Sequence, residues 1–185
     1  MYLELVQKMV EQGQYYAAIA HLDQLEKTTA AAPQTIYLRA EALRGTGRRD
    51  DAKKLYRRLQ GGCMTGYGLH GLGLLAAEAG QMRQAEEFLE QASRERPVDA
   101  EVHNDLGMIL LLNGRRDDAR REFQTATELD RENPLPLENL IVLMLLENQQ
   151  AEARHLAEER GITTGDMERF VKRAKAWTRR MSSKR

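Results

Sequence analysis

The stretch Ala100–Asn133 reads AEVHNDLGMILLLNGRRDDARREFQTATELDREN, and it decides the fold. An apolar run with helical spacing ends at Asn113-Gly114, and a second helical pattern follows with Ala119, Phe123 and Ala126 on one stripe. Glycine and asparagine adopt the left-handed backbone conformation that commonly ends a helix. The stretch therefore predicts two helices joined by a tight turn.

The same arrangement recurs along the chain at a nearly constant period. A Gly or Asn is followed five residues later by Ala in five places, and the successive copies are 34, 33, 34 and 34 residues apart. The Gly or Asn can end the first helix, and the small Ala lets the second helix pack closely against it. A period of this length indicates an array of helical repeats. The five pairs are Gly13/Ala18, Gly47/Ala52, Gly80/Ala85, Gly114/Ala119 and Asn148/Ala153.

The repeat unit resembles the tetratricopeptide repeat. Two copies carry the resemblance best, Leu72-Gly73 with Ala85 and Leu106-Gly107 with Ala119. The resemblance implies an all-α, right-handed solenoid of about five helix–turn–helix repeats followed by a C-terminal helix. The repeats are expected at about 1–32, 33–65, 66–99, 100–133 and 134–161 within an array of 1–161, and the C-terminal helix within 162–185.

The glycine-rich segment 61–68 is interpreted as a soft joint between the second and third repeats, because each glycine weakens a helix. Residues 66–71 match the pattern G-x-G-x-x-G. No predicted strand precedes them, so the pattern does not indicate a nucleotide site.

The C-terminal segment is amphipathic and basic. Residues 166–185 hold eight basic and two acidic side chains, which gives a net charge of +6. One interpretation is a cap that covers the last repeat, and the alternative is a basic helix for an anionic lipid surface or an acidic partner. The apolar stripe consists of Met167, Phe170, Val171, Ala174, Trp177 and Met181.

Composition argues against several function classes. The 28 basic and 28 acidic residues balance, so there is no overall charge for binding nucleic acid or an anionic membrane. Cys63 is the only cysteine, which excludes an intramolecular disulfide and a cysteine-based metal site. The four histidines lie in different repeats and lack metal-ligand spacing. We therefore predict a protein that is not an enzyme and has no catalytic residues, no cofactor and no metal.

The resemblance implies that the first helix of each repeat lines a concave binding wall. The ninth position of the unit is never Asn, so the carboxylate clamp of some tetratricopeptide domains is not expected. The wall becomes apolar toward the C-terminus and suits an amphipathic helix or an extended apolar segment of a protein partner, with Asn104 able to bond the partner's backbone. The predicted groove residues are Tyr37, Tyr67, His70, Leu74, Asn104, Met108, Leu111, Leu112, Leu135, Glu138, Val142 and Leu145.

The predicted function is that of a scaffold or assembly factor. The chain also resembles the TadD-like tetratricopeptide lipoproteins of tight-adherence pilus assembly, which implies a role in pilus or secretion-system assembly and a place on the periplasmic face of the outer membrane. The expected lipid-attachment cysteine is absent near Met1, so that interpretation requires a leader removed upstream. The alternatives are a cytoplasmic secretion chaperone or co-chaperone and an anionic-surface binder that uses the basic C-terminal helix.

Overall fold

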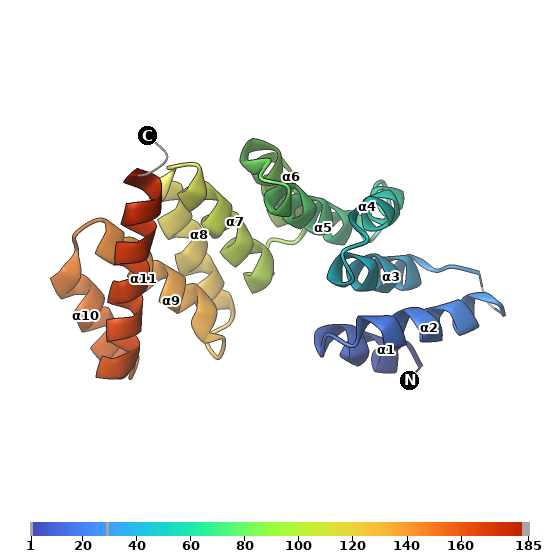
Figure 1. Cartoon of the computed structure of the whole chain (residues 1–185), viewed down its shortest axis with the longest axis horizontal. Coiled ribbons are helices and arrows are strands. Elements are labelled where there is room, and N and C mark those ends of the chain that lie inside the picture. Colours follow the sequence, from blue (N-terminus) through green and yellow to red (C-terminus); the bar gives the residue numbers. More distant parts are fainter. Residues whose placement is uncertain (1, 29, 183–185) are drawn as a thin grey trace. The chain divides into compact units, whose positions relative to one another are not determined.

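The computed structural model describes the backbone of residues 2–28 and 30–182 and the side chains as far as residue 179. The predicted stripe residue Met181 therefore lies outside the described side chains. Eleven helices and no strands make up the regular structure of the described residues. The chain divides into two compact units, Met1–Pro97 and Val98–Arg185, which we call unit 1 and unit 2 (Figure 1). None of the described helices is long and apolar enough to cross a membrane.

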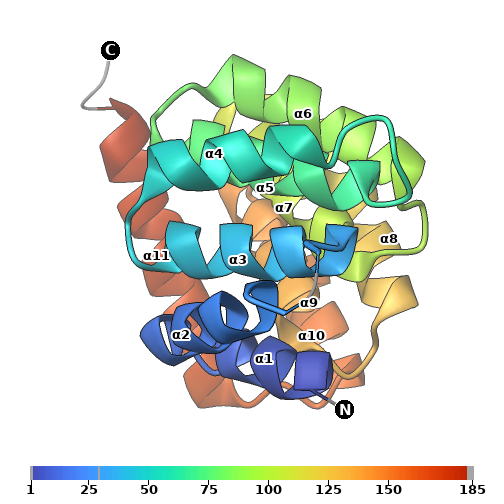
Figure 2. The same ribbon diagram turned by 90° about the vertical axis from the view of Figure 1, so that its right-hand side faces the viewer.

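Unit 1 contains three helix pairs. Its helices are α1 (Tyr2–Glu11), α2 (Tyr15–Glu26), α3 (Pro33–Gly45), α4 (Arg49–Arg58), α5 (Thr65–Glu78) and α6 (Met82–Glu95). The first helix of a pair packs on the second helix of the pair before it, as α3 does on α2 and α5 does on α4. Figure 2 shows α3 lying between α2 and α4.

Unit 2 contains two further pairs and a single C-terminal helix. The pairs are α7 (Ala100–Leu112) with α8 (Arg116–Leu129) and α9 (Pro134–Leu146) with α10 (Gln150–Glu159), and the last helix is α11 (Thr164–Ser182). The side chain of Asp99 caps α7 by accepting the N–H groups of Glu101 and Val102. Asn133 caps α9, and Pro134 occupies its first turn. These signals place the starts of the first helices where the repeat predicts them.

The predicted turns are confirmed at all five pairs. Gly114 has φ +82°, and the N–H groups of Gly114 and Arg115 donate to the carbonyls of Leu111 and Leu110. This is the double hydrogen bond that closes a helix through a left-handed residue. Asn148 is the one described non-glycine residue with a positive φ, 61°. Asparagine tolerates this conformation because its short polar side chain can bond locally. The fold class, an all-α array of five helix–turn–helix repeats with a C-terminal helix, follows from these turns.

The glycine-rich segment was wrongly interpreted as a soft joint over part of its length. Gly66 and Gly68 are buried inside the continuous helix α5. Gly71 and Gly73 lie in later turns of the same helix and are also buried. A Cβ on Gly71 would lie 2.2 Å from a ring carbon of Tyr56, and one on Gly73 would lie 2.7 Å from Leu89. These glycines let α5 approach α4 and α6, so in this helix they contribute close packing.

The start of α11 is fixed by a reciprocal cap. Thr163 Oγ1 accepts the N–H of Asp166 at 3.1 Å and donates to Asp166 Oδ2 at 2.7 Å. The hydrogen bond from Thr163 lowers the pKa of the Asp166 carboxyl, and the nearby Arg169 guanidinium lowers it further. The carboxylate form is therefore favoured in the folded protein.

Replacing Thr163 with alanine is expected to lower the Tm of unit 2 by a few degrees at pH 7. A lowered folded pKa stabilises the fold above the unfolded Asp value of about 3.9, and this contribution disappears as the pH falls through the folded pKa. The difference in Tm between the two proteins should therefore shrink in acid. Thermal unfolding at pH 7 and pH 3 measures it, and Thr164→Ala is the matched control. An equal loss from both variants, or a difference that does not depend on pH, would contradict the cap.

Candidate functional site

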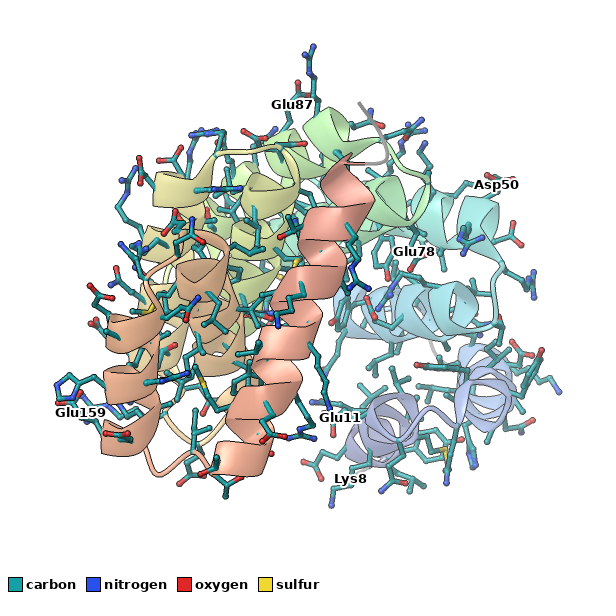
Figure 3. All side chains as sticks on the ribbon, turned by 60° about the vertical axis from the view of Figure 1, so that its left-hand side comes forward. Lys8, Glu11, Asp50, Glu78, Glu87 and Glu159 are labelled. Carbon is teal, nitrogen blue, oxygen red and sulfur yellow. The ribbon has the colours of Figure 1, made fainter. Side chains whose placement is uncertain are left out.

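The inner side of unit 1 carries a charged network that holds three helices together. Tyr56 Oη donates to Glu41 Oε1 at 2.5 Å, and Arg44 forms ion pairs with Glu41 at 2.8 Å and with Glu78 at 3.3 Å. Arg49 reaches Glu78 from α4 at 2.8 Å. In Figure 3 Glu78 lies beside α3, whereas Asp50 extends outward from α4.

Burial and the charge of Glu41 raise the pKa of Tyr56, so its phenol stays protonated and acts as a donor. The polar groups of Glu41, Arg44 and Tyr56 thus bond to one another within the network. Glu41 and Arg44 lie one turn apart on α3, whereas the phenol of Tyr56 comes from α4, so the sequence of a single helix does not predict the network.

The four predicted groove residues of unit 1 differ in accessibility. Tyr37 and Tyr67 pack edge to face with their ring centres 5.0 Å apart, and the guanidinium carbon of Arg96 lies 3.7 Å from the centre of the Tyr67 ring. Leu74 is half-buried and His70 is buried. Tyr37 and Tyr67 are thus brought together, and the Arg96 contact was not predicted from the sequence.

The eight predicted residues of unit 2 divide between the core and the surface. Leu111 and Val142 are only 3% and 2% exposed, so both side chains belong to the core of the unit. Met108, Leu112 and Leu145 are half-buried, and Leu135 is 46% exposed. A polar substitution at Leu111 would disrupt the core of the unit, so a loss of binding in that variant would report on folding and not on the groove.

Asn104 is buried and already hydrogen-bonded, so in this structure its side chain is not available to a partner's backbone. Its Oδ1 accepts from Nδ2 of Asn139 at 2.8 Å, which joins α7 to α9. Oδ1 of Asn139 in turn accepts from a guanidinium nitrogen of Arg173 on α11. Buried amides need such partners, because an unpaired polar group in the core is costly. The relay ties the three helices together.

The C-terminal helix α11 packs against α9 and scarcely touches α10, although α10 immediately precedes it (Figure 1). Phe170 and Ala174 of its apolar stripe are buried, and Arg173 lies 3.9 Å from Glu138 across the contact. The predicted groove residue Glu138 is therefore partly covered by α11. The sequence could not show this, because the stripe on α11 fits any apolar neighbour.

Comparison with known proteins identifies the repeat. Residues 76–143 match the family model described as tetratricopeptide repeat. The chain is 33% identical over 177 residues to the TPR repeat-containing protein PA4299 of Pseudomonas aeruginosa, and the match spans 95% of this chain and 70% of that protein. The chain belongs to the tetratricopeptide repeat family.

Solved tetratricopeptide structures share the fold at lower identity. PilF of Pseudomonas aeruginosa has a TM-score of 0.70 at 18% identity and matches 85% of this chain and 72% of its own. MamA of Desulfovibrio magneticus has a TM-score of 0.63 at 18% identity, with 94% of each chain covered. YrrB, described as a tetratricopeptide protein with an unusual peptide-binding site, has a TM-score of 0.63 at 20% identity, with 95% of this chain and 90% of YrrB covered. Tetratricopeptide arrays serve as protein-interaction scaffolds through the surfaces that their stacked helices create.

Proposed function

We propose that this tetratricopeptide protein is an assembly factor that binds an amphipathic helix or an extended apolar segment of a partner protein on the inner wall of unit 2. By inner wall we mean the side chains of Met108, Leu112, Leu135 and Leu145. One observation carries the proposal. These accessible apolar side chains lie on α7 and α9, two first helices that are held side by side by the Asn104–Asn139 hydrogen bond.

The chemistry of the wall favours an apolar segment. Covering a half-exposed Leu or Met contributes about 1 kcal/mol, so the four side chains supply roughly 4 kcal/mol before the entropy cost of binding. Such a contact needs further polar bonds to become specific, and a helix laid in an apolar groove is one recurrent way of providing them. Peptide binding by YrrB, which shares the fold, supports a peptide or helix as the ligand.

The resemblance to TadD-like proteins extends the proposal to bacterial pilus or secretion-system assembly, with a periplasmic location. The same wall would serve the alternative, a cytoplasmic chaperone that holds an apolar segment before its secretion. A strain that lacks the gene separates the two roles. Loss of surface pili supports the first, and accumulation of unfolded or degraded secretion substrate in the cytoplasm supports the second.

Changing Met108 and Leu112 together to aspartate is expected to abolish capture of the partner, because two charges would replace the accessible apolar contact. Pull-down from an extract of the source cell measures capture, and circular dichroism checks that the double variant folds. Arg116→Asp with Gln124→Asp is the control, since both residues are exposed on α8 of the same unit. Binding that survives the Met108 and Leu112 changes and is lost when 162–185 are removed would contradict the proposal and would favour the C-terminal helix as the binding element.

A further inference from the structure

The space between α10 and α11 forms a groove that the repeat pattern leaves open. A cavity of about 570 Å³ lies between the two helices, and the four apolar residues that line it are Ala157, Ile162, Met167 and Val171. A second cavity of about 390 Å³ shares Arg154, Val171 and Lys175 with the first, so the two continue along the same face of α11. The four apolar residues form the floor of what we call the α10–α11 groove.

The groove exists because the last joint is built differently from the earlier ones. Within each unit, a first helix packs on the second helix of the preceding pair, as α3 does on α2 and α9 does on α8. At the α2–α3 joint, Arg39 closes the contact by pairing with Asp23 at 2.7 Å and Glu26 at 3.0 Å. Because α11 packs on α9 instead, the side of α10 that a following helix would cover remains uncovered.

The charges along the groove match an acidic partner. Arg154 on α10 and Lys172 and Lys175 on α11 are exposed and line the cavities. Among the described residues, none of the three has an ion-paired or hydrogen-bonded partner. In contrast, Arg173 on the opposite side of α11 is bonded to Asn139, and Arg169 is bonded to Asp166. The cations of α11 that face α9 or its own N-terminus are thus satisfied, and those that face the groove are not.

The ends of the groove differ in charge. Glu158 and Glu168 lie at the end near the α10–α11 loop, in the larger cavity. The smaller cavity, at the other end, is lined by Arg154 and Lys175 without an acidic side chain. Like charges that face each other across a gap repel. A ligand with carboxylates at this end relieves the repulsion.

We propose that the α10–α11 groove is a second binding site, for an acidic amphipathic helix of a partner protein that occupies the place of the first helix of a sixth repeat. Leucine-type side chains at i, i+3, i+4 and i+7 would contact Ile162, Met167 and Val171. Asp or Glu side chains on its flank would pair with Arg154, Lys172 and Lys175. This groove shares only Leu145, which lines the smaller cavity, with the inner wall of unit 2.

The probe for this site is a synthetic helical peptide of about 18 residues, which is long enough to form a helix on binding. It carries Leu in the i, i+3, i+4, i+7 pattern and Glu at the flanking positions, and a second peptide has Lys in place of every Glu. Binding is followed by fluorescence anisotropy and by the methyl signals of methionines in the full chain. Met167 reports on the α10–α11 groove and Met108 reports on the inner wall.

The acidic peptide is expected to shift the Met167 methyl signal and to leave Met108 unchanged. Lys172→Glu with Lys175→Glu should weaken its binding about tenfold, since each position loses an ion pair and gains a repulsion. The matched pair is Lys175→Glu against Arg179→Glu. Both residues are exposed on α11, but only Lys175 lines the cavities, so Arg179→Glu should leave the affinity within about twofold.

Three results would overturn this site: an unchanged Met167 signal, equal binding of the Lys peptide, or equal losses from the Lys175 and Arg179 variants. Vesicles that contain phosphatidylglycerol serve as a further arm. If they bind while the acidic peptide does not, and both charge reversals weaken vesicle binding equally, the cations serve a lipid surface instead. Each of these failures leaves the Met108 signal and the pull-down on the inner wall unaffected, so it can be distinguished from a failure of the proposed function.

Discussion

Replacing Phe170 with alanine is expected to destabilise unit 2 by about 3–4 kcal/mol, because removing a buried aromatic ring costs both its burial and the cavity that it leaves. Phe170 is 4% exposed and is the largest buried side chain that α11 contributes to the contact with α9. A cavity of about 250 Å³, lined in part by Pro134, Leu137 and Phe170, already lies beside it. Few neighbouring atoms are therefore close enough to move into the volume that the lost ring would leave.

Urea unfolding followed by tryptophan fluorescence measures the effect. Trp177 is the only tryptophan of the chain and lies on α11, so it reports directly on this helix. Tyr16→Ala is the control, because that aromatic ring is 79% exposed and its loss should change stability little. A Phe170 variant as stable as the wild type would show that α11 contributes no packing energy to α9. Such a result would contradict the position described for α11.

Replacing Gly71 with alanine is expected to destabilise unit 1 by about 3 kcal/mol, at the upper end of the usual cost of overpacking. The added methyl group would lie 2.2 Å from the ring of Tyr56, which has no exposed surface. The ring cannot rotate away easily, because its hydroxyl is bonded to Glu41 and to Arg44. Either the ring or α5 must move, and each movement costs core packing.

The matched control for this prediction is Gly165→Ala. Gly165 lies in the first turn of α11, where an added Cβ would meet only Thr163 at 3.9 Å. Alanine favours helix over glycine by up to about 1 kcal/mol, so this variant should be as stable as the wild type or slightly more stable. Thermal unfolding by circular dichroism gives the stabilities, and the methyl signal of Met64, which packs against the cluster around Tyr56, locates the change in unit 1. Equal stability of the two variants would contradict the close packing of α5.

The turns and helix pairs could be predicted from the sequence because they depend on local chemistry. Gly114 and Asn148 occupy left-handed positions that few other residues tolerate, and their regular spacing with Ala119 and Ala153 identifies the pairs. The same local reasoning does not explain Gly71, because a glycine resembles a helix breaker when it is considered alone. Glycine is needed at this position because α5 packs closely against the ring of Tyr56, 15 residues earlier in the chain.

The candidate sites could be predicted only in part, because accessibility depends on contacts between distant segments. The family pattern places Met108, Leu112, Leu111 and Val142 alike on the inner side, but only the structure separates the two accessible side chains from the two buried ones. The bond from Asn139 to Asn104 spans 35 residues and leaves no signal in the repeat. The α10–α11 groove likewise exists because α11 packs against α9, and the amphipathic stripe of α11 does not determine which helix it packs against.

The central claim is that Met108 faces a bound partner protein, and photo-crosslinking in the source cell tests it most directly. A photoreactive amino acid is placed at position 108 on α7 and, as a control, at position 124, which is exposed on α8 of the same unit. We expect a discrete crosslinked product from position 108 that disappears when Leu112 is changed to aspartate, and no such product from position 124. No crosslink at 108, or the same product from both positions, would contradict the inner wall of unit 2 as the binding surface.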